Sequence, residues 1–283
     1  MKWRGRRGSG NIIDRRRAGG RGRGVAVGGA GGFGLLAIVV VGYFLGVDLT
    51  PLLDDGQMQT GGGEITAADE EAAQFVSVTL ADTEEIWTDI FANELDRSYD
   101  PAELVLFKGA TQSACGGASA ATGPFYCPPE ERIFLDTGFF TTLERQLGAG
   151  GDFAAAYVVA HEVAHHVQNE LGVLGEINAV RSRSDEATSN ALSVRIELQA
   201  DCFSGIWARS AEAMFGSLEP GDIEEAMNAA ARIGDDTLQR EAGRTVRPDS
   251  FTHGTSEQRQ RWFATGYQQG SIAACDTFAA DRI

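Results

Sequence analysis

The residues with the clearest chemical potential form one short motif, His161-Glu162-Val163-Ala164-His165. The motif follows an Ala- and Val-rich run at 153–160 whose pattern predicts a helix. Residues four apart lie on one face of a helix, so both imidazoles can reach a single ion, and neutral imidazole is a good ligand of Zn²⁺. Glu162 would lie beside the metal, where a carboxylate can take a proton from bound water. The motif therefore predicts a zinc site with Glu162 as general base.

A catalytic zinc ion needs a third protein ligand and keeps its fourth position for water. Glu197 and Asp201 are also four residues apart, on a later predicted helix. If that helix returns antiparallel, Glu197 would lie over the motif as the third ligand. Asp201 would then hydrogen-bond the far nitrogen of a ligand histidine, preferably His161, and fix its tautomer. The alternative is that both acids lie on a solvated outer face, but the apolar residues at 202–207 favour burial.

The other two histidines have different predicted roles. His253 precedes a predicted helix start, so we expect it on a loop. There it either ligates zinc in place of Glu197 or, as we prefer, donates a hydrogen bond to the oxyanion as a catalytic residue; a purely structural role is the third option. Arg259 either supports His253 or pairs with an acid. His166 lies off the metal face of its helix, and we expect it to pack or to support a ligand.

The rest of the sequence predicts a predominantly helical α+β fold with a small sheet. Apolar periodicity and turn residues place helices at about 66–95, 139–147, 152–171, 185–215, from 220, 235–243 and 255–269, and strands at 104–107 and 132–136. Asp136, Asp152 and either Thr255 or Ser256 are the predicted caps of three of these helices. Residues 172–184 are predicted to form a loop after Gly172.

The four cysteines predict disulfides rather than a metal site, because no Cys-x-x-Cys spacing occurs. Four cysteines allow three pairings. We prefer Cys115–Cys127 and Cys202–Cys275, because the short first loop closes naturally. Each bridge would contribute about 3–4 kcal/mol in an oxidising compartment. The alternative is four reduced thiols, with Cys202 buried in a helix.

Charge is distributed unevenly along the chain. The whole chain has 24 Lys+Arg against 40 Asp+Glu, a net charge of -16, which argues against nucleic acid as the main partner. Residues 1–23 are nevertheless strongly basic, and residues 24–47 carry no charge. With its glycines and alanines, the uncharged run reaches the roughly 20 residues needed to cross a bilayer.

These patterns predict four segments: a basic cytoplasmic tail (1–23), a single transmembrane anchor (24–47), a linker (48–65) and an extracytoplasmic metallopeptidase domain (66–283). The lipid bilayer would be one partner of the chain. A cleaved signal peptide is the nearest alternative, although no small-x-small cleavage site follows the apolar run. A soluble Gly-rich tail is the other. The sequence does not indicate an oligomeric state.

At these residues the chain resembles the neutral zinc metallopeptidase family of bacterial membrane-anchored proteins. The resemblance rests on the basic start at 1–5, the segments 115–116 and 123–128, the HExxH motif, and the segments 197–202 and 252–254. HExxH followed by a helix with ExxxD also resembles the gluzincin arrangement seen in thermolysin. The resemblance implies a zincin-like domain with His161, His165 and Glu197 as ligands, Glu162 as base and Asp201 behind a ligand. It also implies a small sheet whose edge strand, here at 132–136 or near it, binds substrate backbone.

The predicted function is therefore a membrane-anchored endopeptidase with one Zn²⁺ per chain, acting on a peptide or protein substrate. An alternative from another class is a membrane-anchored binding or assembly protein with a structural or degenerate zinc site. A hydrolase of a non-protein amide, such as cell-wall peptide, is a third hypothesis.

Overall fold

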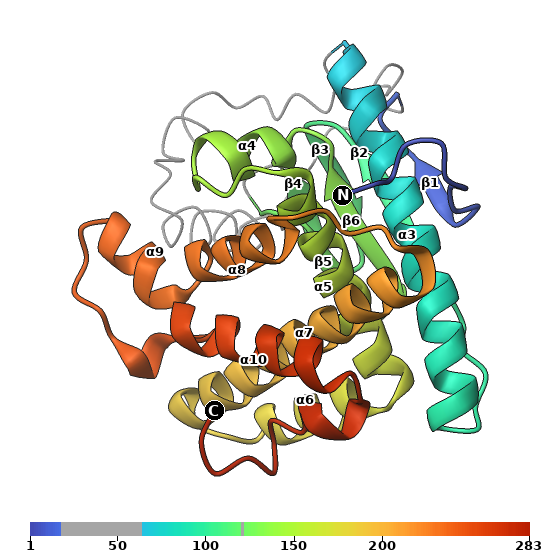
Figure 1. The fold of residues 1–283 in the computed structure, drawn as a ribbon. Helices are drawn as coiled ribbons and strands as arrows, with labels where there is room; N and C mark the ends of the chain where they lie inside the picture. The colour runs from blue at the N-terminus through green and yellow to red at the C-terminus, as the bar shows by residue number, and fades with distance from the viewer. Residues whose placement is uncertain (18–63, 120–121) are drawn as a thin grey trace.

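A computed structural model describes residues 1–17, 64–119 and 122–283 (Figure 1). The helices are α3 (Ala67–Glu94), α4 (Phe139–Arg145), α5 (Asp152–Glu170), α6 (Val173–Arg181), α7 (Glu186–Phe215), α8 (Asp222–Arg232), α9 (Asp235–Glu241) and α10 (Ser256–Gln269). The strands are β1 (Ile12–Asp14), β2 (Glu103–Phe107), β3 (Ala110–Ser113), β4 (Gly116–Ser119), β5 (Phe125–Cys127) and β6 (Arg132–Asp136). Two short 3-10 segments, η2 (Pro248–Ser250) and η3 (Ile272–Cys275), complete these elements. The predicted α+β class, mainly helical with little sheet, is confirmed.

The main sheet has the strand order β1-β2-β6-β5. Strands β1, β2 and β6 run parallel, and β5 is antiparallel to β6. Four of the five residues in β2 and in β6 are buried, as expected for interior strands covered on both faces. Of the edge strand expected at 132–136 or near it, the first position is wrong, because β6 is paired on both sides, with β2 and with the neighbouring β5. The free edge near the HExxH helix is β5, whose three residues gave too short a pattern to identify.

Helix α5 lies between the sheet and the pair α7 and α10 (Figure 1). Helices α7 and α10 cross at glycines: a Cβ added to Gly266 would lie 1.8 Å from the Cys202 carbonyl oxygen, and one added to Gly205 would lie 2.1 Å from the Phe263 oxygen. The missing side chains let the two backbones touch. This close approach brings the first turn of α10 against the middle of α7, where Glu197 and Asp201 lie.

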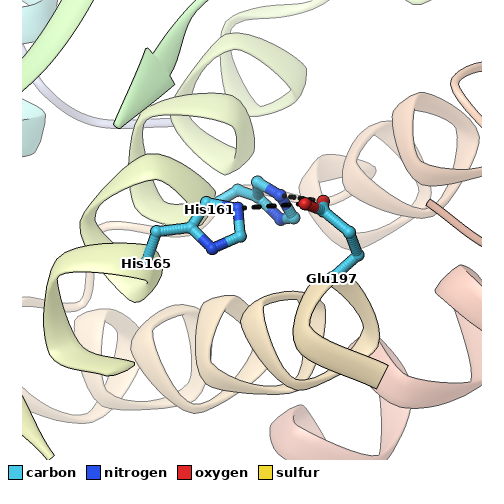
Figure 2. Close-up of side chains that lie close together, drawn as sticks. All are labelled: His161, His165 and Glu197. Carbon is cyan, nitrogen blue, oxygen red and sulfur yellow. Dashed lines mark hydrogen bonds and ion pairs between the residues drawn. The ribbon is translucent and has the colours of Figure 1, made fainter. Parts of the chain in front are cut away.

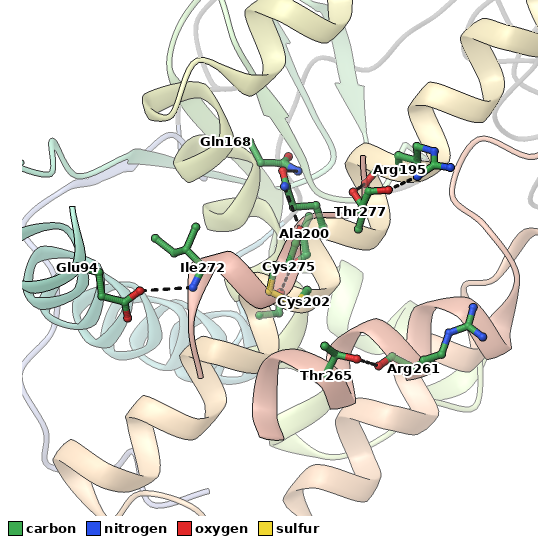
Figure 3. The surroundings of a disulfide bond; sticks show 12 residues. Glu94, Gln168, Arg195, Ala200, Cys202, Arg261, Thr265, Ile272, Cys275 and Thr277 are labelled. Atoms are coloured by element: carbon green, nitrogen blue, oxygen red, sulfur yellow. Dashed lines mark hydrogen bonds between the residues drawn. A yellow bond between two sulfur atoms is a disulfide. The ribbon is translucent and has the colours of Figure 1, made fainter. Parts of the chain in front are cut away.

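Both preferred disulfides are present. Cys115–Cys127 joins the residue before β4 to the end of β5. Cys202–Cys275 joins the middle of α7 to η3, near the C-terminal end of the chain (Figure 3). The described residues contain no free cysteine.

Several local predictions are also correct, because helix starts depend on short-range hydrogen bonds. The helix predicted from about 185 begins there as α7, and Asp185 caps it by accepting from the Thr188 amide at 2.8 Å. Thr255 caps α10 together with Gln258 in a reciprocal capping box. Asp136 and Asp152 are not helix caps: Asp136 accepts from the amides of Gly109 and Gly138 at a turn, and Asp152 is the first residue inside α5.

The predicted loop at 172–184 is wrong, because most of it forms α6. Gly172 does end α5 in the left-handed conformation, with φ of 81°. The chain then re-enters a helix at once, since Leu174 is buried and Ile177 packs on the core. Tertiary burial, rather than a local start signal, explains this helix.

Residues 1–17 pack on the domain instead of forming a separate tail. Met1 and Trp3 are each only 5% exposed, and β1 extends the sheet beside β2. Arg6 pairs with Asp82 of α3 at 2.6 Å. A single span at 24–47 would place residues 1–17 and the domain on opposite sides of a membrane. That arrangement is incompatible with this packing.

Among the residues described, no helix is both long enough and apolar enough to cross a membrane. The predicted anchor at 24–47 and nearly all of the predicted linker at 48–65 lie outside the described residues.

Candidate metal centre

The two motif histidines and Glu197 converge from α5 and α7 (Figure 2). The Glu197 carboxylate lies 3.1 Å from His161 Nε2 and 3.5 Å from His165 Nε2. One nitrogen from each imidazole and one carboxylate oxygen lie within 4.8 Å of one another. The helical spacing of His161 and His165 and the antiparallel return of α7 together create this cluster. His253 is not part of it.

This donor set fits a zinc ion. Zn²⁺ in catalytic sites takes three protein ligands of nitrogen and oxygen type and leaves one position for water. The described residues provide three such donors here. Burial by itself raises the pKa of Glu197, but the charges and hydrogen bonds of His165 and His161 bring it well below its usual value. The carboxylate is therefore ionised, as a ligand must be.

His161 is held from behind by a buried carboxylate. Its Nδ1 lies 3.0 Å from Asp201 Oδ1, within ion-pair distance although without good hydrogen-bond geometry. Burial opposes a charge on His161 and lowers its pKa, but Asp201 and Glu197 outweigh burial and raise the pKa to about 10. A bound metal ion would therefore have to displace a proton from this site. Asp201 lies behind His161, whereas the hydrogen bond between them stays a prediction.

Asp201 is itself held by two side chains from other elements. Arg259 of α10 donates from Nε and Nη2 to its two oxygens at 2.8 and 2.9 Å. Tyr157, one turn before His161, donates its hydroxyl at 2.5 Å. Asp201 is fully buried and Arg259 only 2% exposed, so the pair is ionic and dry. Arg259 thus pairs with an acid and does not hydrogen-bond His253.

Glu162 is buried beside the histidines and lines the same cavity. Burial raises its pKa above the usual value, and His165 and His161 offset only part of that effect. A carboxylate with a raised pKa is a stronger base than an ordinary one. This property suits a group that takes a proton from water.

His253 lies at the rim of the cavity, with half of its side chain exposed. Asp235 of α9 fixes its loop by accepting from the amides of Thr252, His253 and Gly254 at 2.6 to 3.0 Å. Its other oxygen lies 3.3 Å from His253 Nδ1. Partial burial lowers the pKa of His253, but Asp235 and Glu197 raise it above the usual value overall. His253 can therefore carry a proton while lining the same cavity as the metal cluster.

His166 packs away from the cluster. Its Nε2 lies 2.6 Å from the Asp100 carbonyl and its Nδ1 3.1 Å from the Tyr126 hydroxyl. It therefore joins α5 to β5 and to the loop before β2.

A cavity of about 610 Å³ opens beside the cluster. Edge strand β5 contributes Phe125 and Tyr126 to its wall, and α6 contributes Leu174, Asn178 and Arg181.

Three residues of the site were not identified from the sequence. Gln168 accepts from His165 at 2.8 Å, Asp235 holds the His253 loop, and Tyr157 holds Asp201. Gln168 and Tyr157 did carry a signal, because each lies three or four residues from a motif histidine on the same helix. Asp235 carried none, since only the fold brings α9 to the loop at 252–254.

The relatives of this chain include the protein named "Uncharacterized protein YpfJ" from Escherichia coli K12, which is 45% identical over 289 residues covering 98% of this chain and 99% of that protein. Proteins from Mycobacterium bovis ("Uncharacterized protein Mb2605") and Mycobacterium tuberculosis H37Rv ("Uncharacterized protein Rv2575") are 44% identical over 192 residues, 64% of each chain. No solved structure matches the chain. The model of the family described as "Putative neutral zinc metallopeptidase" matches residues 1–278, and the chain belongs to this family.

Proposed function

We propose that this protein is a zinc-dependent endopeptidase. One observation carries the proposal: the Nε2 atoms of His161 and His165 and the Glu197 carboxylate face one another beside a cavity that Glu162 also lines. When bound, zinc would polarise a peptide carbonyl and lower the pKa of water. Three donors are the number found in catalytic sites, whereas structural zinc sites are usually closed by four.

The side chains of this protein divide the remaining work. Glu162 takes the proton from the attacking water and later delivers it to the leaving amine. His253, protonated and held by Asp235, donates a hydrogen bond to the oxyanion that develops on the former carbonyl. Asp201 orients His161 from behind.

The substrate is an extended peptide segment. The free edge of β5 offers backbone groups that can pair with an added strand, a mode of recognition that makes few demands on sequence. Its position on the wall of the cavity supports this choice over β6, which has no free edge.

We further propose that the domain works in an oxidising compartment outside the cytoplasm, because both cysteine pairs form disulfides. A single membrane span at 24–47 is not part of this proposal, because residues 1–17 pack on the domain.

The test is the variant Glu162→Gln, assayed on an unbiased peptide library with and without a chelator. Loss of the base should abolish zinc-dependent cleavage while the metal content stays stoichiometric. Glu176→Gln, an exposed residue of α6, is the matched control and should retain the wild-type rate. Full activity of Glu162→Gln would contradict the mechanism. Wild-type protein that binds zinc but cleaves no peptide would favour a binding role.

A further inference from the structure

A chain of buried amides connects the second zinc-site histidine to the far side of α7. His165 Nδ1 lies 2.8 Å from Gln168 Oε1. Gln168 Nε2 donates to the Ile196 carbonyl at 2.8 Å and to Gln199 Oε1 at 3.0 Å. Gln199 Nε2 in turn donates to the Cys275 carbonyl at 3.1 Å. Gln168 is fully buried and Gln199 is 7% exposed, so solvent has little access to this chain.

The direction of these hydrogen bonds follows from their two ends, because a backbone carbonyl can only accept. The side-chain atom that faces the Ile196 carbonyl and the one that faces the Cys275 carbonyl must therefore both be donors. Gln199 must turn its nitrogen to Cys275, which leaves its oxygen facing Gln168. Gln168 must turn its nitrogen to both acceptors, which leaves its oxygen facing His165.

An amide oxygen is also only an acceptor, so the hydrogen of this last contact comes from His165 Nδ1. With the proton on Nδ1, the lone pair of the neutral ring is on Nε2, the nitrogen that faces Glu197. A reversed Gln168 amide would set its oxygen against the Ile196 carbonyl and Gln199 Oε1 with no proton between them. Buried acceptors facing each other in this way are costly.

The Cys202–Cys275 disulfide fixes one end of this series of hydrogen-bonded amides. Figure 3 shows the bond joining α7 to η3, with Gln168 of α5 above it. Thr277 adds a second attachment by donating to the Arg195 carbonyl at 2.7 Å. The Cys275 carbonyl is therefore held against α7, where Gln199 can reach it.

We propose that Gln168 is a positioning residue that keeps the proton of His165 on Nδ1, so that Nε2 is available to the metal. This role rests on the proposed zinc site. It is distinct from that of Asp201, which stands behind the other histidine and is negatively charged. The two ligand histidines are thus oriented by different means, one by a carboxylate and one by a neutral amide anchored on backbone carbonyls.

The first experiment locates the proton by ¹⁵N NMR of imidazole-labelled, metal-free, full-length protein. The chain has only four histidines, so the signals can be assigned by substitution. We expect His165 to carry a slowly exchanging proton on Nδ1, because that nitrogen lies 2.8 Å from the buried Gln168 Oε1. Gln168→Met, which keeps the size and loses the acceptor, should lose that signal. A wild-type His165 with a bare Nδ1 would overturn the proposal.

The second experiment measures zinc affinity by competition with a chelator. Gln168→Met should weaken binding by about 10- to 100-fold, the usual effect of removing a partner of a ligand histidine. Gln168→Glu retains an acceptor for His165 while losing both amide donors, so it should regain most of the affinity although the fold is destabilised. Gln199→Met should reduce zinc affinity less than Gln168→Met does, because the Ile196 carbonyl still holds the Gln168 amide in place.

Gln239→Met is the matched control. Gln239 is a buried glutamine of α9 that bonds to Ser250 and to the Arg247 amide and does not contact the metal cluster. The variant Gln239→Met should lower the melting temperature about as much as Gln168→Met does, without changing zinc affinity. Equal zinc affinity of Gln168→Met and Gln239→Met would reduce Gln168 to a packing residue. Because the NMR experiment needs no metal and no activity, failure of the proposed enzymatic function would leave its outcome unaffected.

Discussion

Replacing Arg259 by Met would leave the carboxylate of Asp201 buried without its cation. In the wild-type protein the guanidinium neutralises a fully buried Asp201 through two hydrogen bonds of 2.8 and 2.9 Å. Methionine fills much of the same volume but can neither donate a hydrogen bond nor carry a charge. The hydroxyl of Tyr157 and the ring of His161 would remain as the partners of the carboxylate.

The expected loss of stability is large, because removing one member of a buried ion pair typically costs 3–5 kcal/mol, or roughly 6–20 °C in melting temperature for a domain of this size. Burial by itself raises the pKa of Asp201, and Arg259 is the main cause of its net lowering. A lowered folded-state pKa stabilises the protein above the unfolded-state pKa, and this contribution is lost on acidification. Without Arg259 the pKa of Asp201 rises. The difference in unfolding free energy between wild type and variant should therefore be largest at neutral pH and become smaller toward about pH 4.

The assay is denaturant unfolding of metal-free protein from neutral to acidic pH, so that zinc binding does not enter. The double variant Asp201→Asn with Arg259→Met removes the unpaired charge and should be more stable at neutral pH than Arg259→Met alone. A single variant within about 1 kcal/mol of wild type, the size of a surface effect, would refute the interpretation of a dry ion pair. A loss of unfolding free energy that does not change with pH would refute it as well.

Two further predictions concern other parts of the molecule. Trp3→Ala should destabilise the domain by about 3–5 kcal/mol, because Trp3 is buried against Phe75 of α3; unchanged thermal unfolding would mean that residues 1–17 are not part of the fold. Zinc should bind more tightly as pH rises through the neutral range and release a proton, because Asp201 and Glu197 hold one on His161; calorimetry in buffers of different ionisation enthalpy measures this, and pH-independent binding would contradict it.

The sequence alone determined what depends on spacing within one element. A helical turn of 3.6 residues places His161 and His165 on one face, and the same arithmetic applies to Glu197 and Asp201. The sequence also placed the cap of α10 at Thr255 or Ser256, since a cap bonds an amide only a few residues away, and Thr255 is the cap. The short loop from Cys115 to Cys127 favoured the disulfide pairing that the structure contains.

Contacts between distant segments were decided by tertiary packing. That Glu197 rather than His253 faces the histidines depends on how α7 packs across α5, and the position of Arg259 depends on glycines that let α10 touch α7. The basic composition of 1–23 indicated a tail, because no count of charges reveals that acids of α3 and α8 pair with residues 1–17.

The same contrast between spacing and packing applies to Gln168, which supports one of the two zinc-site histidines. Gln168 was within range on its own helix, but nothing in a sequence shows which way an amide is turned. That direction is set by carbonyls of Ile196 and Cys275, and only the folded chain brings them to one place. Spacing along a helix thus determines which side chains can bind the same ion. Packing determines which residues contact each of them, and through those contacts their charge and the position of their protons.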